Sequence, residues 1–128
     1  MRKKSVDILD LDIPNVCFSL ANSLPENDSR RKKLKKQRIE RGFDSTELWN
    51  LDKTITDFVL PRLRAFAKNI HGYPACFEDG GNEWEEILTK MLKSFELLSR
   101  DFFASDEEQK LIDEGLELFA KYYGSLWN

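Results

Sequence analysis

Apolar residues recur at steps of three and four along the last two thirds of this chain. Because an α-helix completes a turn in about 3.6 residues, each such series lies on one face of a helix. Helices of this kind bury their apolar faces against one another, so the pattern predicts an all-α fold, a compact bundle of three long amphipathic helices over residues 43–128. The three series are Leu48, Leu51, Ile55, Phe58, Val59, Leu63, Phe66 and Ile70; Trp84, Ile87, Leu88, Met91, Phe95, Leu98 and Phe102; and Leu111, Ile112, Leu116, Phe119, Tyr122, Tyr123 and Leu126.

Residues that commonly begin helices stand before each series. Asp44 with Glu47, and Ser105 with Glu108, have the three-residue spacing of a capping box, in which each side chain accepts from a free backbone N–H of the other residue. Asn82 is a candidate cap for the middle helix. These signals predict where the three helices begin.

The segment before the bundle has a different character. Residues 29–41 consist of charged residues and good helix formers, and Gly42 is placed to end a helix there. Its two aliphatic residues, Leu34 and Ile39, are five positions apart and share no face, so we expect this basic helix to be held by something other than a buried apolar stripe. Residues 1–28 are predicted to form an extended arm and loop, in a chain that is a single domain overall.

Charge is strongly segregated along the chain. Residues 29–42 hold eight basic residues and one glutamate, a net charge of +7, whereas the whole chain carries −3, so the remainder carries −10. Such a segment can attract a polyanion, either a nucleic-acid backbone or an acidic protein surface, although a solvated helix or a clamp onto the protein's own acidic helices is also consistent with it. The candidate contacts are Arg30, Arg31, Lys32, Lys33, Lys35, Lys36, Arg38 and Arg41.

Two features limit what this basic segment can contact. No aromatic residue is interleaved with its cations, so contact with a nucleic-acid backbone is more natural than base stacking. Membrane binding would need an apolar face beside the basic one, and the segment does not supply it. The N-terminal residues MRKKSVDILDLD are interrupted by acids where a signal peptide needs an apolar run, so we expect a cytoplasmic protein.

Acidic residues suggest an alternative function in catalysis. Glu83 and Glu86 form one ExxE pair, and Glu114 and Glu117 form another on the last predicted helix. Residues three apart share a helix face, so two such pairs on neighbouring helices could bind Mg²⁺, an arrangement similar to that of the all-α nucleotide pyrophosphohydrolases. In that family the second pair has the form ExxD, and first-turn acids also favour a helix dipole without binding metal. A magnesium-dependent hydrolase is therefore the alternative to a non-enzymatic binding protein.

Four blocks of the sequence together resemble a family of short uncharacterised proteins of bacteriophages and prophages. The blocks are LWNLDKTITDFVLPRLRAF (48–66), HGYP (71–74), EWEEILTKMLKSFE (83–96) and EGLELFAKYYGSLW (114–127). The resemblance implies a phage-encoded protein that acts in the host cytoplasm, and it supplies no catalytic residues. It favours a non-enzymatic accessory protein that binds nucleic acid or an acidic host protein. Tyr122, Tyr123 and Trp127 can belong to the core or to a dimer surface, so a homo-oligomer stays open.

Overall fold

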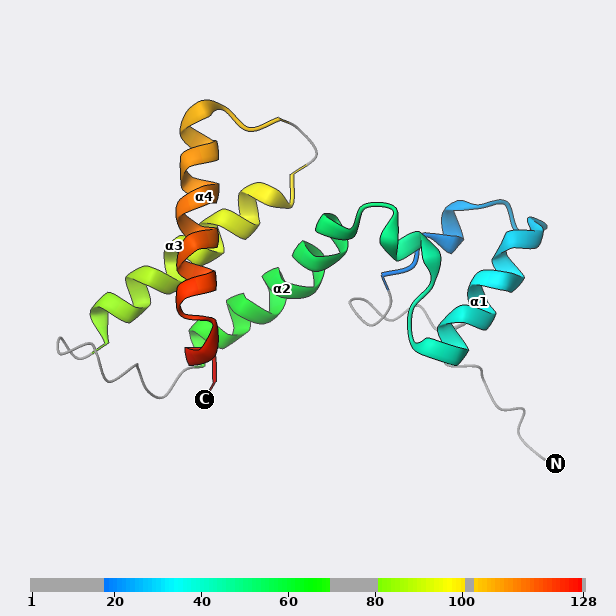
Figure 1. The fold of residues 1–128 in the computed structure, drawn as a ribbon, viewed down its shortest axis with the longest axis horizontal. Coiled ribbons are helices and arrows are strands. Elements are labelled where there is room, and N and C mark those ends of the chain that lie inside the picture. The colour runs from blue at the N-terminus through cyan, green and yellow to red at the C-terminus, as the bar shows by residue number, and fades with distance from the viewer. Residues whose placement is uncertain (1–17, 70–80, 101–102, 128) are drawn as a thin grey trace. The chain divides into compact units, whose positions relative to one another are not determined.

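The computed structural model describes residues 18–69, 81–100 and 103–127, and this part of the chain contains helices and turns but no strand (Figure 1). The predicted all-α class is therefore confirmed for the described residues. The α-helices are α1 (Ser29–Arg41), α2 (Leu51–Lys68), α3 (Asn82–Leu98) and α4 (Asp106–Lys121), and the short 3-10 helices are η2 (Ala21–Ser23), η3 (Ser45–Leu48) and η4 (Tyr123–Ser125). Most of the predicted arm lies outside the described residues.

The chain divides into two compact units, Met1–Ile55 and Thr56–Asn128. Residues of η3 belong with α1 because they exchange hydrogen bonds with it, for example from the Ser45 backbone N–H to the Gln37 side chain. The boundary falls within α2, which continues through Pro61 to Lys68. No described helix is long and apolar enough to cross a membrane.

The second unit is built on a conventional apolar core. Trp84, Leu88 and Met91 of α3 are at most 1% exposed, and they pack with residues of α2 and α4. The predicted apolar faces of α3, α4 and the second half of α2 supply this core. Its buried members are Leu63, Trp84, Ile87, Leu88, Met91 and Phe95, with Val59, Leu60, Phe66, Ala67, Leu92, Leu98, Leu118, Phe119, Tyr122 and Leu126 packed around them.

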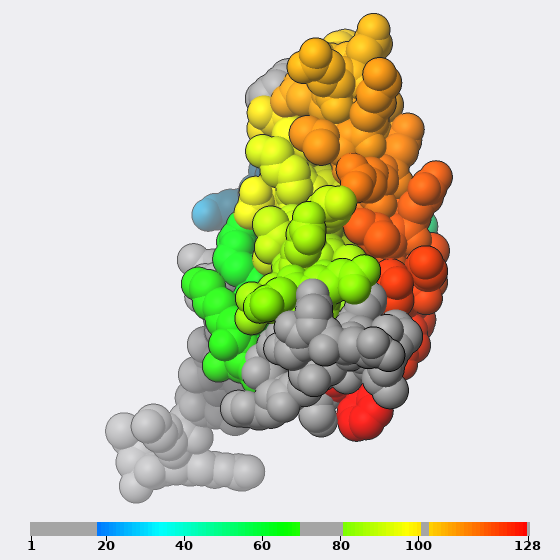
Figure 2. Space-filling model, turned by 90° about the vertical axis from the view of Figure 1, so that its left-hand side faces the viewer, coloured from blue at the N-terminus to red at the C-terminus, as the bar shows by residue number. Residues whose placement is uncertain are grey.

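Helices α3 and α4 approach each other closely at Gly115, and Figure 2 shows them side by side along one face. A Cβ atom on Gly115 would lie 2.2 Å from the Cβ of Ser94 and 2.6 Å from the carbonyl oxygen of Lys90. The buried Ser94 hydroxyl donates to the carbonyl of Ile112 at 2.7 Å. The glycine therefore permits the two helix backbones to lie near enough for a direct side-chain to backbone hydrogen bond.

The helix starts were predicted with mixed success. Both capping boxes, Asp44 with Glu47 and Ser105 with Glu108, are present. The Asp44 box begins the short η3, however, and α2 starts afresh at Leu51 rather than continuing from it. The predicted Asn82 cap is wrong: Gly81 occupies the cap position with a φ of 92°, a left-handed conformation that glycine adopts without strain.

Apolar residues in the first half of α2 and in the turn before it are exposed to solvent. Leu48, Leu51, Ile55 and Phe58, which the sequence assigned to one continuous buried face, are 49–50% exposed. Val59, Leu63 and Phe66, further along the same series, pack in the core of the second unit. The periodic pattern thus predicted the helix correctly, and only its second half is covered within the described residues.

Candidate polyanion interface

Helix α1 forms because both of its ends are satisfied locally. The Asp28 carboxylate accepts from the Arg30 backbone N–H at 2.9 Å, and Gly42 ends the helix with a φ of 84° while its N–H donates to the carbonyl of Arg38. Only Leu34 among its residues is buried. Tertiary packing of an apolar stripe, the usual support for a helix of this length, is therefore nearly absent.

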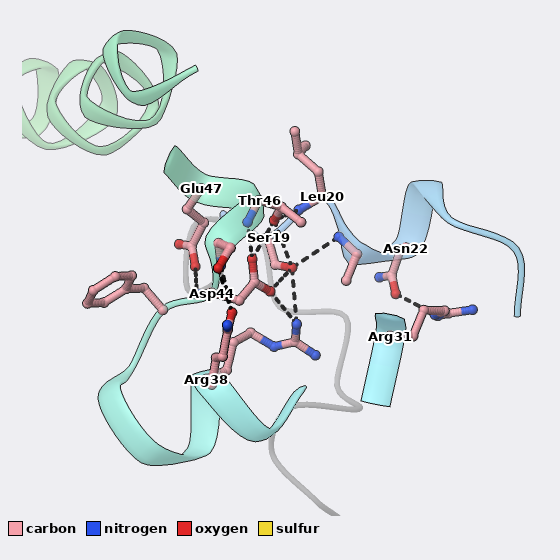
Figure 3. A network of polar contacts seen from close by, with 12 residues as sticks. Ser19, Leu20, Asn22, Arg31, Arg38, Asp44, Thr46 and Glu47 are labelled. Atoms are coloured by element: carbon pink, nitrogen blue, oxygen red, sulfur yellow. Dashed lines mark hydrogen bonds and ion pairs between the residues drawn. The ribbon is translucent and has the colours of Figure 1, made fainter. Parts of the chain in front are cut away.

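A buried polar cluster attaches α1 to the chain before and after it (Figure 3). We call Ser19, Arg38, Asp44 and Thr46 the Asp44 cluster. Asp44 is fully buried, and it accepts hydrogen bonds from the Ser19 hydroxyl, the Thr46 N–H and hydroxyl, and the Arg38 guanidinium. Burial alone would raise the pKa of Asp44, but these donors outweigh it and hold the pKa below its usual value. The carboxylate is therefore charged and fully paired at neutral pH.

Further polar contacts strengthen the same attachment. The Gln37 side chain accepts from the N–H and hydroxyl of Ser45 at 2.9 and 3.0 Å, and the Leu20 N–H donates to the Thr46 hydroxyl at 2.7 Å. The Glu47 carboxylate accepts from the Asp44 N–H at 2.7 Å. These contacts agree with the expectation that the basic helix is held by something other than an apolar face.

The four arginines of α1 all bind groups of the protein itself. Arg38, predicted as a partner contact, is instead 11% exposed and pairs with Asp44, because one face of the helix, that of Leu34, is turned inward. Arg30 binds Asp28 through two nitrogens, at 3.0 and 2.7 Å. The remaining two are also engaged: Arg31 donates to the Asn22 side chain at 2.9 Å, and Arg41 donates to the carbonyl of Phe43 and lies 4.4 Å from its ring centroid.

Three of the four lysines of α1 lie on one exposed side of the helix. Ser29, Lys32, Lys33 and Lys36 are spaced at three and four and so share one helix face, which is exposed. Together with Lys35, which is half-buried, and Ile39, which is 64% exposed, they line a shallow open groove. Lys36 is 3.8 Å from Glu40 across one turn, an exposed pair of little energetic weight. We call Lys32, Lys33, Lys35 and Lys36 the lysine face.

This division between arginines and lysines was not predicted from the sequence. The spacing contained part of this information. Arg31 and Arg38 are three and four residues from Leu34, the buried aliphatic residue of α1, and therefore share its face. Four of the eight predicted contacts, the lysines, therefore gather on one surface. The arginines have other partners.

The acidic pairs do not assemble into a carboxylate cluster. Among the described residues, no group of three or more acidic, histidine or cysteine side chains is arranged to hold a metal ion. Instead the Lys90 ammonium lies 3.0 Å from Glu114, and hydrogen bonding to Glu114, with a smaller contribution from Glu86, raises the pKa of Lys90. Glu114, one member of the second ExxE pair, is therefore paired with a lysine of α3.

No protein-family model, curated protein or solved structure matches this chain. The resemblance to short phage proteins stays a prediction. The class that the described residues define is an all-helical protein whose basic helix exposes Lys32, Lys33 and Lys36 on one face, while each of its arginines contacts a group of the protein itself.

Proposed function

We propose that this chain is a non-enzymatic binding protein whose lysine face contacts the phosphate backbone of nucleic acid. The observation that carries the proposal is the orientation of α1. The Asp44 cluster fixes one side of the helix to the protein, so Lys32, Lys33 and Lys36 are exposed together on another side. Positive charge gathered on one exposed face attracts a polyanion by Coulomb forces and by release of its counterions.

The residue type on this face favours phosphate over an acidic protein surface. Protein–protein interfaces are depleted in lysine, whereas lysine commonly binds phosphate as a point charge. Here each arginine already contacts a group of the protein, although Arg30 and Arg41 are exposed, whereas Lys32, Lys33 and Lys36 share one exposed face. With no aromatic residue on α1 for base stacking, we expect binding that is independent of sequence.

The origin of the protein, its location and the arrangement of its helices are inferred from the phage resemblance and the sequence pattern. We infer a phage-encoded accessory protein of the host cytoplasm, with α1 and the N-terminal arm appended to a compact bundle of three long amphipathic helices. Since α1 and the arm lie outside the blocks that carry the resemblance, the nucleic-acid contact would be particular to this protein.

The test is binding of the full chain to labelled DNA and RNA, single- and double-stranded, across a salt series. Three to four lysine–phosphate contacts predict a slope of about −2.7 to −3.6 in log affinity against log salt on duplex DNA. That slope corresponds to a loss of about 40- to 150-fold in affinity between 50 and 200 mM salt.

The lysine face is tested by reversing Lys32, Lys33 and Lys36 to glutamate. A matched control reverses Lys68, Lys93 and Lys110, which are exposed lysines outside α1, and it changes the net charge by the same amount. We expect the first variant to lose roughly 100-fold in affinity at low salt and the control to lose less than about 5-fold. Equal losses would mean that only net charge matters, and absence of binding by the wild type at low salt would leave an acidic protein surface as the partner.

A further inference from the structure

The turn and helix that follow α1 expose a group of large apolar side chains within the first unit. We call Phe43, Leu48, Trp49, Leu51 and Ile55 the apolar patch; they are 39–55% exposed. Single exposed apolar residues are ordinary on protein surfaces, whereas a contiguous set of this size commonly marks an interface. The patch is distinct from the lysine face, which lies on α1.

Part of the apolar patch is hollow. Phe43, Glu47, Leu48, Leu51 and Thr54 line a groove of about 230 Å³. Trp49, which is 55% exposed, directly follows Leu48 in the chain but does not line this groove. The first unit therefore presents both a half-exposed tryptophan and, next to it in the chain, an apolar groove large enough to receive an indole ring.

We propose that the apolar patch is the interface of a symmetric dimer, in which the Trp49 ring of each copy enters the groove of the other. A two-fold axis pairs one surface with the same surface of a second copy. One arrangement therefore places each copy's indole in the other copy's groove. Leu51 and Ile55, four residues apart on α2, also share one helix face, as residues at a seam between paired helices do.

The size of the apolar patch agrees with a second copy as the occupant. Taking roughly 200 Å² for a large apolar side chain, five that are half-exposed offer about 500 Å² per copy, or about 1,000 Å² in a dimer before any polar rim is added. That is the lower limit for a specific interface, so we expect a dissociation constant in the micromolar range.

Charge favours the same occupant. Residues 48–55 contain one aspartate and one lysine, so the segment has no net charge and two copies meet there without repulsion. A lipid surface is a poorer fit, because helices that lie on membranes usually carry several basic residues beside their apolar face. The cations beside this patch are Lys53 and Arg41, and Arg41 already donates to the carbonyl of Phe43 and lies over its ring, so the patch offers a polyanion little.

The test is sedimentation velocity of the full chain over roughly 1–200 µM, in about 0.5 M salt so that repulsion between the basic helices is screened. No nucleic acid is present, so the result is independent of the function proposed above. We expect conversion from a 15.0 kDa monomer to a dimer of twice that mass as concentration rises.

Two variants address the patch and one serves as a control. Trp49→Ala removes the inserted indole, and Ile55→Glu places a charge in the interface, so each should weaken dimerisation by roughly 100-fold or more. Trp127→Ala removes a tryptophan that is 77% exposed in the second unit and should dimerise as the wild type does. Circular dichroism checks that each variant keeps its helices. If one of the two patch variants unfolds, the dimerisation of the other one tests the proposal.

Three outcomes would overturn the proposal. The first is a wild type that stays monomeric over the whole range, in which case another segment or another protein covers the patch. The second is a dimer that Trp49→Ala and Ile55→Glu leave intact. The third is a dimer that only Trp127→Ala disrupts, which would place the interface at the end of the last helix.

Discussion

Replacing Asp44 with asparagine should release α1 from the rest of the first unit. The Asp44 carboxylate is fully buried, and the side chain of its partner Arg38 is only 11% exposed. The substitution therefore leaves the Arg38 guanidinium poorly solvated and without its counter-charge. Asparagine caps helices about as well as aspartate. The variant therefore removes the charge pair and keeps the capping function at the start of η3.

The size of the effect follows from the burial of the pair. Removing one partner of a buried ion pair costs about 3–5 kcal/mol, and the residual exposure of Arg38 places the expected loss near the lower end, about 3 kcal/mol. Few apolar side chains offset this, since Ala21 and Leu34 are the buried hydrophobic residues of the described part of the first unit. A loss of this size is a large fraction of the stability of a small domain.

Hydrogen exchange resolved along the chain measures this loss separately in the two units. A change of about 3 kcal/mol accelerates exchange through local opening by roughly 100-fold, and we expect this in Ser29–Arg41. Amides of Asn82–Leu98 in the second unit serve as an internal reference and should change little. Asp106→Asn, an exposed aspartate in the first turn of α4, makes the same change in net charge and should leave α1 protected.

The reasoning would be refuted if α1 protection in Asp44→Asn changed by less than about 5-fold, or if both units lost protection equally. A double-mutant cycle with Arg38→Gln isolates the pair: the double variant should cost less than the sum of the two single variants, because neither charge is then left alone.

Two further predictions concern the second unit. Gly115→Ala should destabilise it by about 1–3 kcal/mol in urea unfolding, despite the better helix propensity of alanine, because the new methyl group collides with Ser94; Gly124→Ala, which meets no atom within 4 Å, should be nearly neutral. The Ser105 N–H and Arg100 hold the pKa of Glu108 at about 2, below its value in the unfolded chain, so the stabilisation is complete above the normal glutamate pKa and is lost as pH falls toward 2. Thermal melting of Glu108→Gln should accordingly show a smaller drop between neutral and acid pH, and an unchanged drop would contradict this assignment.

The sequence predicted the positions of the main helices and most of the second unit's core, because both depend on local, periodic signals. Trp84 and Met91 fall where the three-and-four spacing placed them. The burial of Ser94 and Gly115 could not be foreseen, since a close helix crossing depends on how two faces meet rather than on either face alone.

Predictions for the first unit were weaker for a related reason. The sequence showed that α1 lacks an apolar stripe, and from this it followed that other contacts must hold it. It did not reveal that Arg38 pairs with Asp44, because a polar cluster formed by residues 19, 38, 44 and 46 leaves no periodic trace. The eight basic residues consequently looked equivalent, although Arg38 is largely buried and Lys32, Lys33 and Lys36 share an exposed face.

The different surroundings of the two kinds of cation make the salt experiment interpretable. Exposed lysine–phosphate contacts are screened over about 8–10 Å at ordinary ionic strength, whereas a buried pair such as Arg38 with Asp44 is screened much less. Raising the salt should therefore release nucleic acid from the lysine face before it loosens α1. Acid should act on α1 rather than on the lysines. Hydrogen bonds lower the pKa of Asp44, so the stabilisation of α1 by this carboxylate is present above the usual aspartate pKa and disappears as pH falls through the lower folded value. If binding and α1 protection were lost together in salt at neutral pH, the helix would be held by exposed charges and the assignment of the Asp44 cluster as its anchor would be wrong.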